Sequence, residues 1–172
     1  MAKKKSSGGL ITKIVALVFA VLSFVAMAFP FMTAIVSLTV AGRSTSESAS
    51  SSFSEWLDSL STAQEFGSDK VGGYVTAKVF MIIALIAIAI VAVLVVVKFF
   101  MDHKIINLLL FIASLVALIA SIAFLIAFVA GGLQMSSFGD YMTALYIPNA
   151  GSIILGVSGI VTAALGLKLR KA

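Results

Sequence analysis

The longest uninterrupted apolar stretch in the chain runs from Val79 to Val97, VFMIIALIAIAIVAVLVVV, nineteen residues without a charged or polar side chain. A helix of this length is about 28 Å long, close to the thickness of a bilayer's hydrocarbon core. Lys78 and Lys98 frame the stretch, so a charge lies at each headgroup layer. β-Branched residues disfavour a helix in water, but the cost of an unpaired backbone amide in lipid outweighs that preference. The pattern predicts a transmembrane helix.

The same pattern of long apolar stretches separated by polar segments repeats along the chain. Residues 101–104, MDHK, form a very short turn, so the spans on either side of it must be antiparallel neighbours. Gly131-Gly132 predicts the end of the span that follows. Four spans that alternate in direction predict an up-down bundle. The predicted spans are residues 10–31, 74–100, 105–130 and 149–167.

The first apolar stretch, residues 10–41, would be about 48 Å long as one helix, too long to cross a bilayer upright. Pro30 lacks an amide donor and clashes with the preceding turn, so the helix should kink or end there. We expect a span over 10–31, with residues 32–41 leaving the membrane as a tilted extension. A cleaved signal peptide is the alternative, because early lysines, an apolar run and Ala26-Met27-Ala28 fit that pattern. The apolar stretch continues without a break, which favours an uncleaved anchor.

The longest polar connection, residues 42–73, changes in character along its length. Seven of the eleven residues from Ser44 to Ser54 are serine, a composition that cannot bury a core, so we expect this part to be mobile. The connection at 131–148 is shorter and is also predicted to be a loop.

An amphipathic helix is predicted after the serine-rich segment. Ser52 and Glu55 have the spacing of a capping box, and Gly67 would end a helix over residues 53–66. Its apolar face has three alternative destinations: the membrane interface, where tryptophan is common, the top of the bundle, or a partner protein. The apolar residues at helical spacing are Phe53, Trp56, Leu57 and Leu60.

Composition agrees with a membrane domain. Of the residues, 61% are apolar and 11% charged, whereas a soluble domain would carry about 25% charged residues. Lipid must therefore cover the apolar surface, and we expect one integral membrane domain over residues 1–172. The chain has no cysteine, which excludes disulfides, thiolate catalysis and cysteine-based metal sites.

Charge is distributed unevenly between the two sides of the predicted membrane. The N-terminal segment through Lys13, the 98–104 turn and the C-terminus carry a formal charge of +8. The connections at 42–73 and 131–148, with Lys78, carry −3. The positive-inside rule then predicts cytoplasmic N- and C-termini and an extracytoplasmic amphipathic helix. The pI of 9.6 therefore reflects membrane orientation and gives no indication of nucleic-acid binding.

Helices in lipid associate through close packing of small residues and through hydrogen bonds. The fourth span carries small residues at intervals of four and three, and the first span has a shorter row. In the third span polar residues recur every seven positions. We expect these rows to form the seams of the bundle; the alternative is that the polar row lines a water path. The small-residue rows are Ser152, Gly156, Gly159, Ala163 and Gly166, and Ala16, Ala20 and Ser23; the polar row is Asn107, Ser114 and Ser121.

No ionisable side chain lies deep in a predicted span, since Lys13 is within a turn of the membrane edge. Proton-coupled carriers and voltage sensors place ionisable groups at membrane depth, so these classes are disfavoured. His103 is the sole histidine, and one histidine cannot assemble a zinc site. The sequence has no nucleophile paired with a base and no phosphate-binding glycine loop. We therefore expect no catalytic site, no cofactor and no metal.

Four spans, cytoplasmic termini, a longer first outer connection and a short inner turn resemble the layout of claudins and tetraspan proteins. The resemblance covers the whole chain as topology. The first connection holds one tryptophan, Trp56, where claudins carry a Trp…Gly-Leu-Trp-Cys-Cys pattern, and the cysteines of both groups are missing. The resemblance therefore implies a topology and transfers no functional residue.

The sequence thus predicts an all-α fold: a four-helix up-down membrane bundle with a short amphipathic extracytoplasmic helix. For function we expect a non-enzymatic membrane protein that acts through helix–helix or outer-face association, as a scaffold, an accessory subunit or a homo-oligomer. Its expected partners are the lipid bilayer and either a second copy or another membrane protein. The alternative is an oligomeric channel or pore subunit in which Asn107, Ser114 and Ser121 line the path.

Overall fold

The computed structural model describes residues 7–40, 42–65, 72–134 and 142–170. Most of these residues are helical, and four helices are long and apolar enough to cross a membrane. The chain is therefore an integral multi-pass membrane protein. The four long helices are α1 (Ser7–Val25), α3 (Gly72–Phe100), α4 (Lys104–Gln134) and α5 (Ala150–Leu169).

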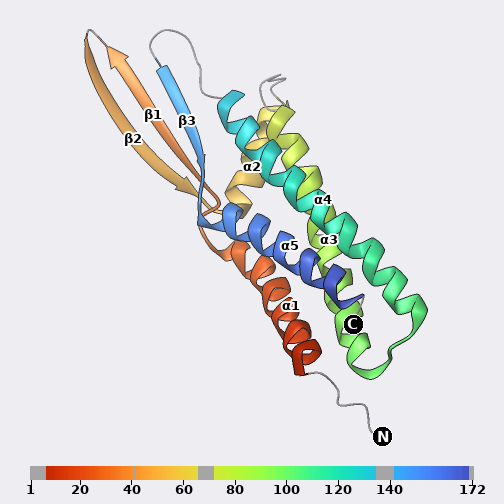
Figure 1. The fold of residues 1–172 in the computed structure, drawn as a ribbon. Helices are drawn as coiled ribbons and strands as arrows, with labels where there is room; N and C mark the ends of the chain where they lie inside the picture. The colour runs from red at the N-terminus through yellow and green to blue at the C-terminus, as the bar shows by residue number, and fades with distance from the viewer. Residues whose placement is uncertain (1–6, 41, 66–71, 135–141, 171–172) are drawn as a thin grey trace, which may run out of the picture.

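The four long helices pack side by side, and α5 contacts all three of the others. In Figure 1, α5 runs between α1 and α4, and the turn from α3 to α4 lies at the same end as the start of α1. We call this end the turn end. The opposite end carries three strands and the short helix α2 (Phe53–Glu65), and we call it the sheet end.

The sheet corrects the expectation of a purely α-helical fold. Its three strands are antiparallel and pair in the order β2-β1-β3. The residues expected to extend the first helix form the central strand, the serine-rich segment pairs with it, and the connection before the fourth span supplies the third strand. The strands are β1 (Met32–Val40), β2 (Arg43–Ser51) and β3 (Met142–Pro148).

The reason for the sheet lies in backbone pairing, which the serine composition does not reveal. The first helix ends before Pro30, after one turn of 3₁₀ helix, η1 (Ala26–Ala28). β1 is rich in β-branched residues, which favour an extended chain. Gly42, with φ of 78°, permits the tight turn into β2. β1 then pairs with all nine residues of β2, so the serines are ordered without a core of their own.

The sheet is attached to the bundle where α5 begins. The backbone N–H of Gly151 donates to the carbonyl of Pro30 at 2.9 Å. The side chain of Asn149 donates to Thr33 Oγ1 at 2.7 Å, and its oxygen accepts from the N–H of Ala150 at 2.7 Å, which caps α5. A Cβ added at Gly151 would lie within 2.9 Å of three carbonyl oxygens of the segment before β1, so a glycine is required there.

Helix α4 continues past Gly131 and Gly132 to Gln134, beyond the predicted end of the third span. A Cβ at Gly131 would lie 2.9 Å from the backbone nitrogen of Tyr74, and one at Gly132 would lie 2.6 Å from the carbonyl oxygen of Tyr146. These glycines therefore permit the close approach of α3 and β3 to α4, and the helix does not end at them.

Helix α2 begins with the predicted capping box. The backbone N–H of Ser52 donates to Glu55 Oε2 at 2.7 Å and its hydroxyl donates to the same oxygen at 2.9 Å, while the Glu55 N–H donates back to Ser52 Oγ at 3.4 Å. These hydrogen bonds, the backbone one first, lower the pKa of Glu55. The predicted end of this helix at Gly67 lies outside the described residues.

We expect the start of α2 to loosen in acid. Because the pKa of Glu55 is lowered in the folded protein, its stabilising contribution is complete above the ordinary carboxyl pKa of about 4.3 and is lost as the pH falls through the lowered value. Trp56 is the only tryptophan and lies in the first turn of α2, so its fluorescence reports the change. Acid titration in a neutral detergent should show this transition, and Glu55→Gln should abolish it.

The control for this titration is Glu47→Gln, which removes an exposed carboxylate from β2 and should leave the transition in place. A transition that persists unchanged in Glu55→Gln would show that another group is responsible.

Candidate functional site

The small-residue row of α5 faces Ser114 and Ser121, two members of the polar row of α4, inside the bundle. All five residues of the α5 row are buried, and so are two of the three polar residues on α4. A Cβ added at Gly159 would meet Ser121, and one added at Gly166 would meet Ser114. The α5 row and two members of the polar row, Ser114 and Ser121, therefore form one seam between α4 and α5.

The glycines set the distance between these helices. A Cβ at Gly166 would lie 3.2 Å from the Cβ of Ser114 and 3.3 Å from a methyl group of Val91 on α3. The hydroxyls of Ser114 and Ser121 find no conventional hydrogen-bond partner among the described residues. Each hydroxyl lies so close to the position that a Cβ of the facing glycine would take that only a glycine fits there.

The row on α1 forms a second seam with α5. Ala16, Ala20 and Ser23 are all buried, and Ser23 Oγ lies 2.7 Å from Ser158 Oγ. Ser158 also bonds the carbonyl of Ile154, so the pair links the two helices through hydroxyls that are satisfied. Sequence reasoning missed Ser158 because it falls outside the strict four-and-three spacing, although a buried serine beside a glycine is itself a packing signal.

Asn107, the first member of the polar row, belongs to a different cluster at the turn end. Lys98 is only 4% exposed, and its amine donates to the carbonyl of Leu169 and, at 2.6 Å, to Asn107 Oδ1. Asp102 lies 3.7 Å from the same amine and accepts from Asn107 Nδ2 at 3.2 Å. Lys13 in turn donates to the carbonyl of Lys98 at 2.7 Å.

This cluster satisfies helix-end carbonyls that would otherwise lack partners. The Lys98 amine bonds the carbonyl of the last residue of α5, and Lys13 bonds a carbonyl in the last turn of α3. Lys98 therefore joins three helices, although its position at the end of an apolar stretch suggests only a headgroup charge. Asp102, well placed in sequence to cap α4, instead bonds Asn107, while His103 Nδ1 accepts from the backbone N–H of Ile105 at 3.4 Å.

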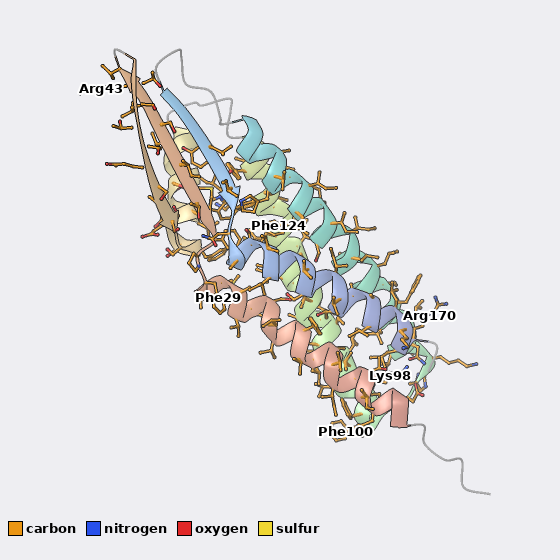
Figure 2. All side chains as sticks on the ribbon, turned by 60° about the vertical axis from the view of Figure 1, so that its left-hand side comes forward. Phe29, Arg43, Lys98, Phe100, Phe124 and Arg170 are labelled. Carbon is orange, nitrogen blue, oxygen red and sulfur yellow. The ribbon has the colours of Figure 1, made fainter. Side chains whose placement is uncertain are left out.

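An aromatic cluster fills the sheet end. Trp56 of α2 is fully buried, with ring centroids 5.0 Å from Phe31 and 5.4 Å from Phe128. Tyr74 and Phe124 extend the cluster into α3 and α4 (Phe124 is labelled in Figure 2). Of the four apolar residues predicted on α2, Trp56 and Leu60 are buried and Phe53 and Leu57 are half-buried against the same cluster.

The apolar face of α2 therefore covers the top of the bundle, one of its three predicted destinations. The spacing of apolar residues within α2 identifies the residues that α2 contributes to the aromatic cluster. The sequence does not identify the cluster residues from other elements, because aromatic side chains are equally common on surfaces that face lipid.

The described residues place few side chains together that could bind a metal ion or take part in catalysis. Among the described residues, no group of three histidine, aspartate or glutamate side chains is placed to hold a metal ion. A groove on the surface of α1 is lined entirely by apolar residues, namely Leu17, Val18, Val21, Leu22 and Val25.

In comparisons with known proteins, neither a protein-family model nor a curated protein matches this chain.

We expect Gly159→Ala to destabilise the bundle, because the added methyl group would meet the Ser121 hydroxyl. Overpacking of a fitted core costs about 1–3 kcal/mol. Combining it with Ser121→Gly should restore much of the loss, since the second change removes the group that the methyl meets. Thermal unfolding in detergent is the measurement.

The matched control is Gly9→Ala, because a Cβ at Gly9 would meet nothing within 4 Å. Equal losses from Gly9→Ala and Gly159→Ala would contradict the close α4–α5 contact. So would a double variant no more stable than Gly159→Ala alone.

Proposed function

We propose that this chain is a non-enzymatic multispanning membrane protein that acts through association at its outer face, as a scaffold, an accessory subunit or a homo-oligomer. By outer face we mean the sheet together with α2. The observation that carries the proposal is strand β2. Among the described residues it pairs with β1 along one edge only, and its residues are exposed apart from a half-buried Ser51.

An exposed edge strand of nine residues offers a row of unpaired backbone donors and acceptors to a partner strand. Proteins that avoid such pairing shorten the edge, bulge it or place proline or lysine in it. β2 has neither proline nor lysine, and its only charges are Arg43 and Glu47. These features support a surface suited to association.

The helix seams support the outer face as the site of association in preference to the membrane interior. The α5 row and the Ser23 contact are occupied within one copy, so they are not free to contact a second. A channel lined by Ser114 and Ser121 would require α4 and α5 to separate, and Asn107 is held by Lys98 and Asp102. These contacts favour association at the outer face over a channel.

We further propose that the turn end is cytoplasmic and that the sheet and α2 are extracytoplasmic. The support is the charge difference of +8 against −3 between the two sides. The likeness to the claudin and tetraspan layout remains a proposal about topology, supported by the four long helices and the short turn between α3 and α4.

The orientation is tested by single cysteines in a chain that has none of its own. Ser50→Cys in β2 should react with an impermeant thiol reagent on intact cells, and His103→Cys in the turn should react only after the membrane is opened. Both positions are exposed, so access depends on the side of the membrane. The reverse labelling would overturn the orientation.

Association is tested by placing a photoreactive amino acid at Ser46 in β2 or at Ile126, which is 65% exposed on α4. Irradiation of intact membranes should link the Ser46 variant to a protein, and mass spectrometry would identify either a second copy or another chain. The Ile126 variant should react mainly with lipid. Protein adducts from Ile126 but none from Ser46 would place association within the membrane and contradict the proposal.

A further inference from the structure

A second surface lies at the turn end and consists of basic residues. Arg170 directly follows α5, is exposed, and holds its guanidinium carbon 4.2 Å from the ring centroid of Phe111 on α4. Stacking on a ring orients a guanidinium while leaving its rim of N–H donors free. Arg170 has no acidic partner among the described residues.

Lys104 lies on the same side of α4 as Phe111. It precedes Phe111 by seven residues, or two helical turns, and it is exposed. On this face Leu108 lies between Lys104 and Phe111, and Leu115 continues the face beyond Phe111; the two leucines are 56% and 40% exposed. One helix face therefore carries a cation at its end and, further along, a ring that supports a second cation, with an apolar side chain on either side of the ring.

The acid that could neutralise these cations is already engaged. Asp102 is the acidic residue of the described turn end, and it contacts Lys98 and Asn107. Figure 2 shows Arg170 at the end of the molecule that carries Lys98, with Arg43 at the far end. The turn end thus presents unpaired positive charge at the level where a spanning helix meets the headgroup layer.

We propose that this face binds an anionic phospholipid, with the lipid phosphate held by Arg170 and Lys104 and an acyl chain lying along Leu108 and Leu115. A stacked arginine can bind phosphate through two parallel hydrogen bonds, and the lysine adds a second charge. The apolar continuation of the face favours a lipid over a soluble phosphate. The site is separate from the outer face and independent of the proposed association.

The test uses the full chain in mixed micelles of phosphatidylcholine and phosphatidylglycerol, with native mass spectrometry of the lipids it retains. The natural protein should retain phosphatidylglycerol preferentially. Arg170→Gln should weaken that retention about five-fold, the effect of one basic residue near a membrane surface. Arg43→Gln makes the same charge change at the sheet end and should have no effect.

Two further variants separate the geometry from the charge. Arg170→Lys keeps the charge but loses the planar stacked group, and Phe111→Leu keeps the arginine but removes its support; each should weaken retention measurably. Thermal unfolding in phosphatidylcholine alone checks that every variant is folded. Equal retention by Arg170→Gln and the natural protein, or equal losses from Arg170→Gln and Arg43→Gln, would overturn the proposal.

Inorganic phosphate distinguishes the two sources of the anion. Added at the same phosphate concentration, it should fail to displace phosphatidylglycerol, because it makes no contact with Leu108 or Leu115. If it displaces the lipid and stabilises the protein equally, the surface is a general phosphate site and the lipid proposal is wrong.

Discussion

Helices α4 and α5 lie so close that a methyl group on Gly159 or Gly166 would overlap a serine of α4. In lipid, apolar side chains gain little by leaving one apolar surrounding for another, so this proximity supplies the main attraction between helices. It also places α5 at the centre of the bundle, where Ala163 packs in one cluster with Ala20 of α1 and Ala117 of α4. Helix α1 packs mainly on α5, and helix α3 packs mainly on α4, so the close α4–α5 pair joins the two halves of the bundle.

Both ends of α5 are tied to other elements by polar contacts. At the sheet end, Asn149 bonds β1 and caps the helix, and the Gly151 amide bonds the segment that leads into β1. At the turn end, Lys98 bonds the last carbonyl of α5 and joins it to α3 and α4. Close packing thus sets the distance between α5 and its neighbours, while polar contacts hold its two ends in place.

The long helices could be predicted from length and hydrophobicity, because lipid leaves the backbone little choice of structure. The start of α2 followed from its capping box, a signal contained within four residues. The small and polar rows indicated which faces are buried, but spacing within one helix cannot reveal that Gly159 faces Ser121. The sheet could not be predicted for a related reason: β2 and β3 are ordered by pairing with β1, and the serine content of β2 describes only its side chains. The burial of Lys98 was likewise not predictable, since the carbonyl that it bonds at the end of α5 is 71 residues away in the sequence.

The sheet joins segments that are made at very different times. β1 follows the first span, whereas its partner β3 is the last connection before α5, with Met32 opposite Pro148. During synthesis the β1–β2 hairpin can form early, but one edge of its central strand stays open until two further helices have been inserted. Pairing over such sequence separation is slow and entropically costly. The finished sheet therefore requires that α3 and α4 have already been made, and a chain truncated before β3 would leave the central strand, β1, as an exposed edge.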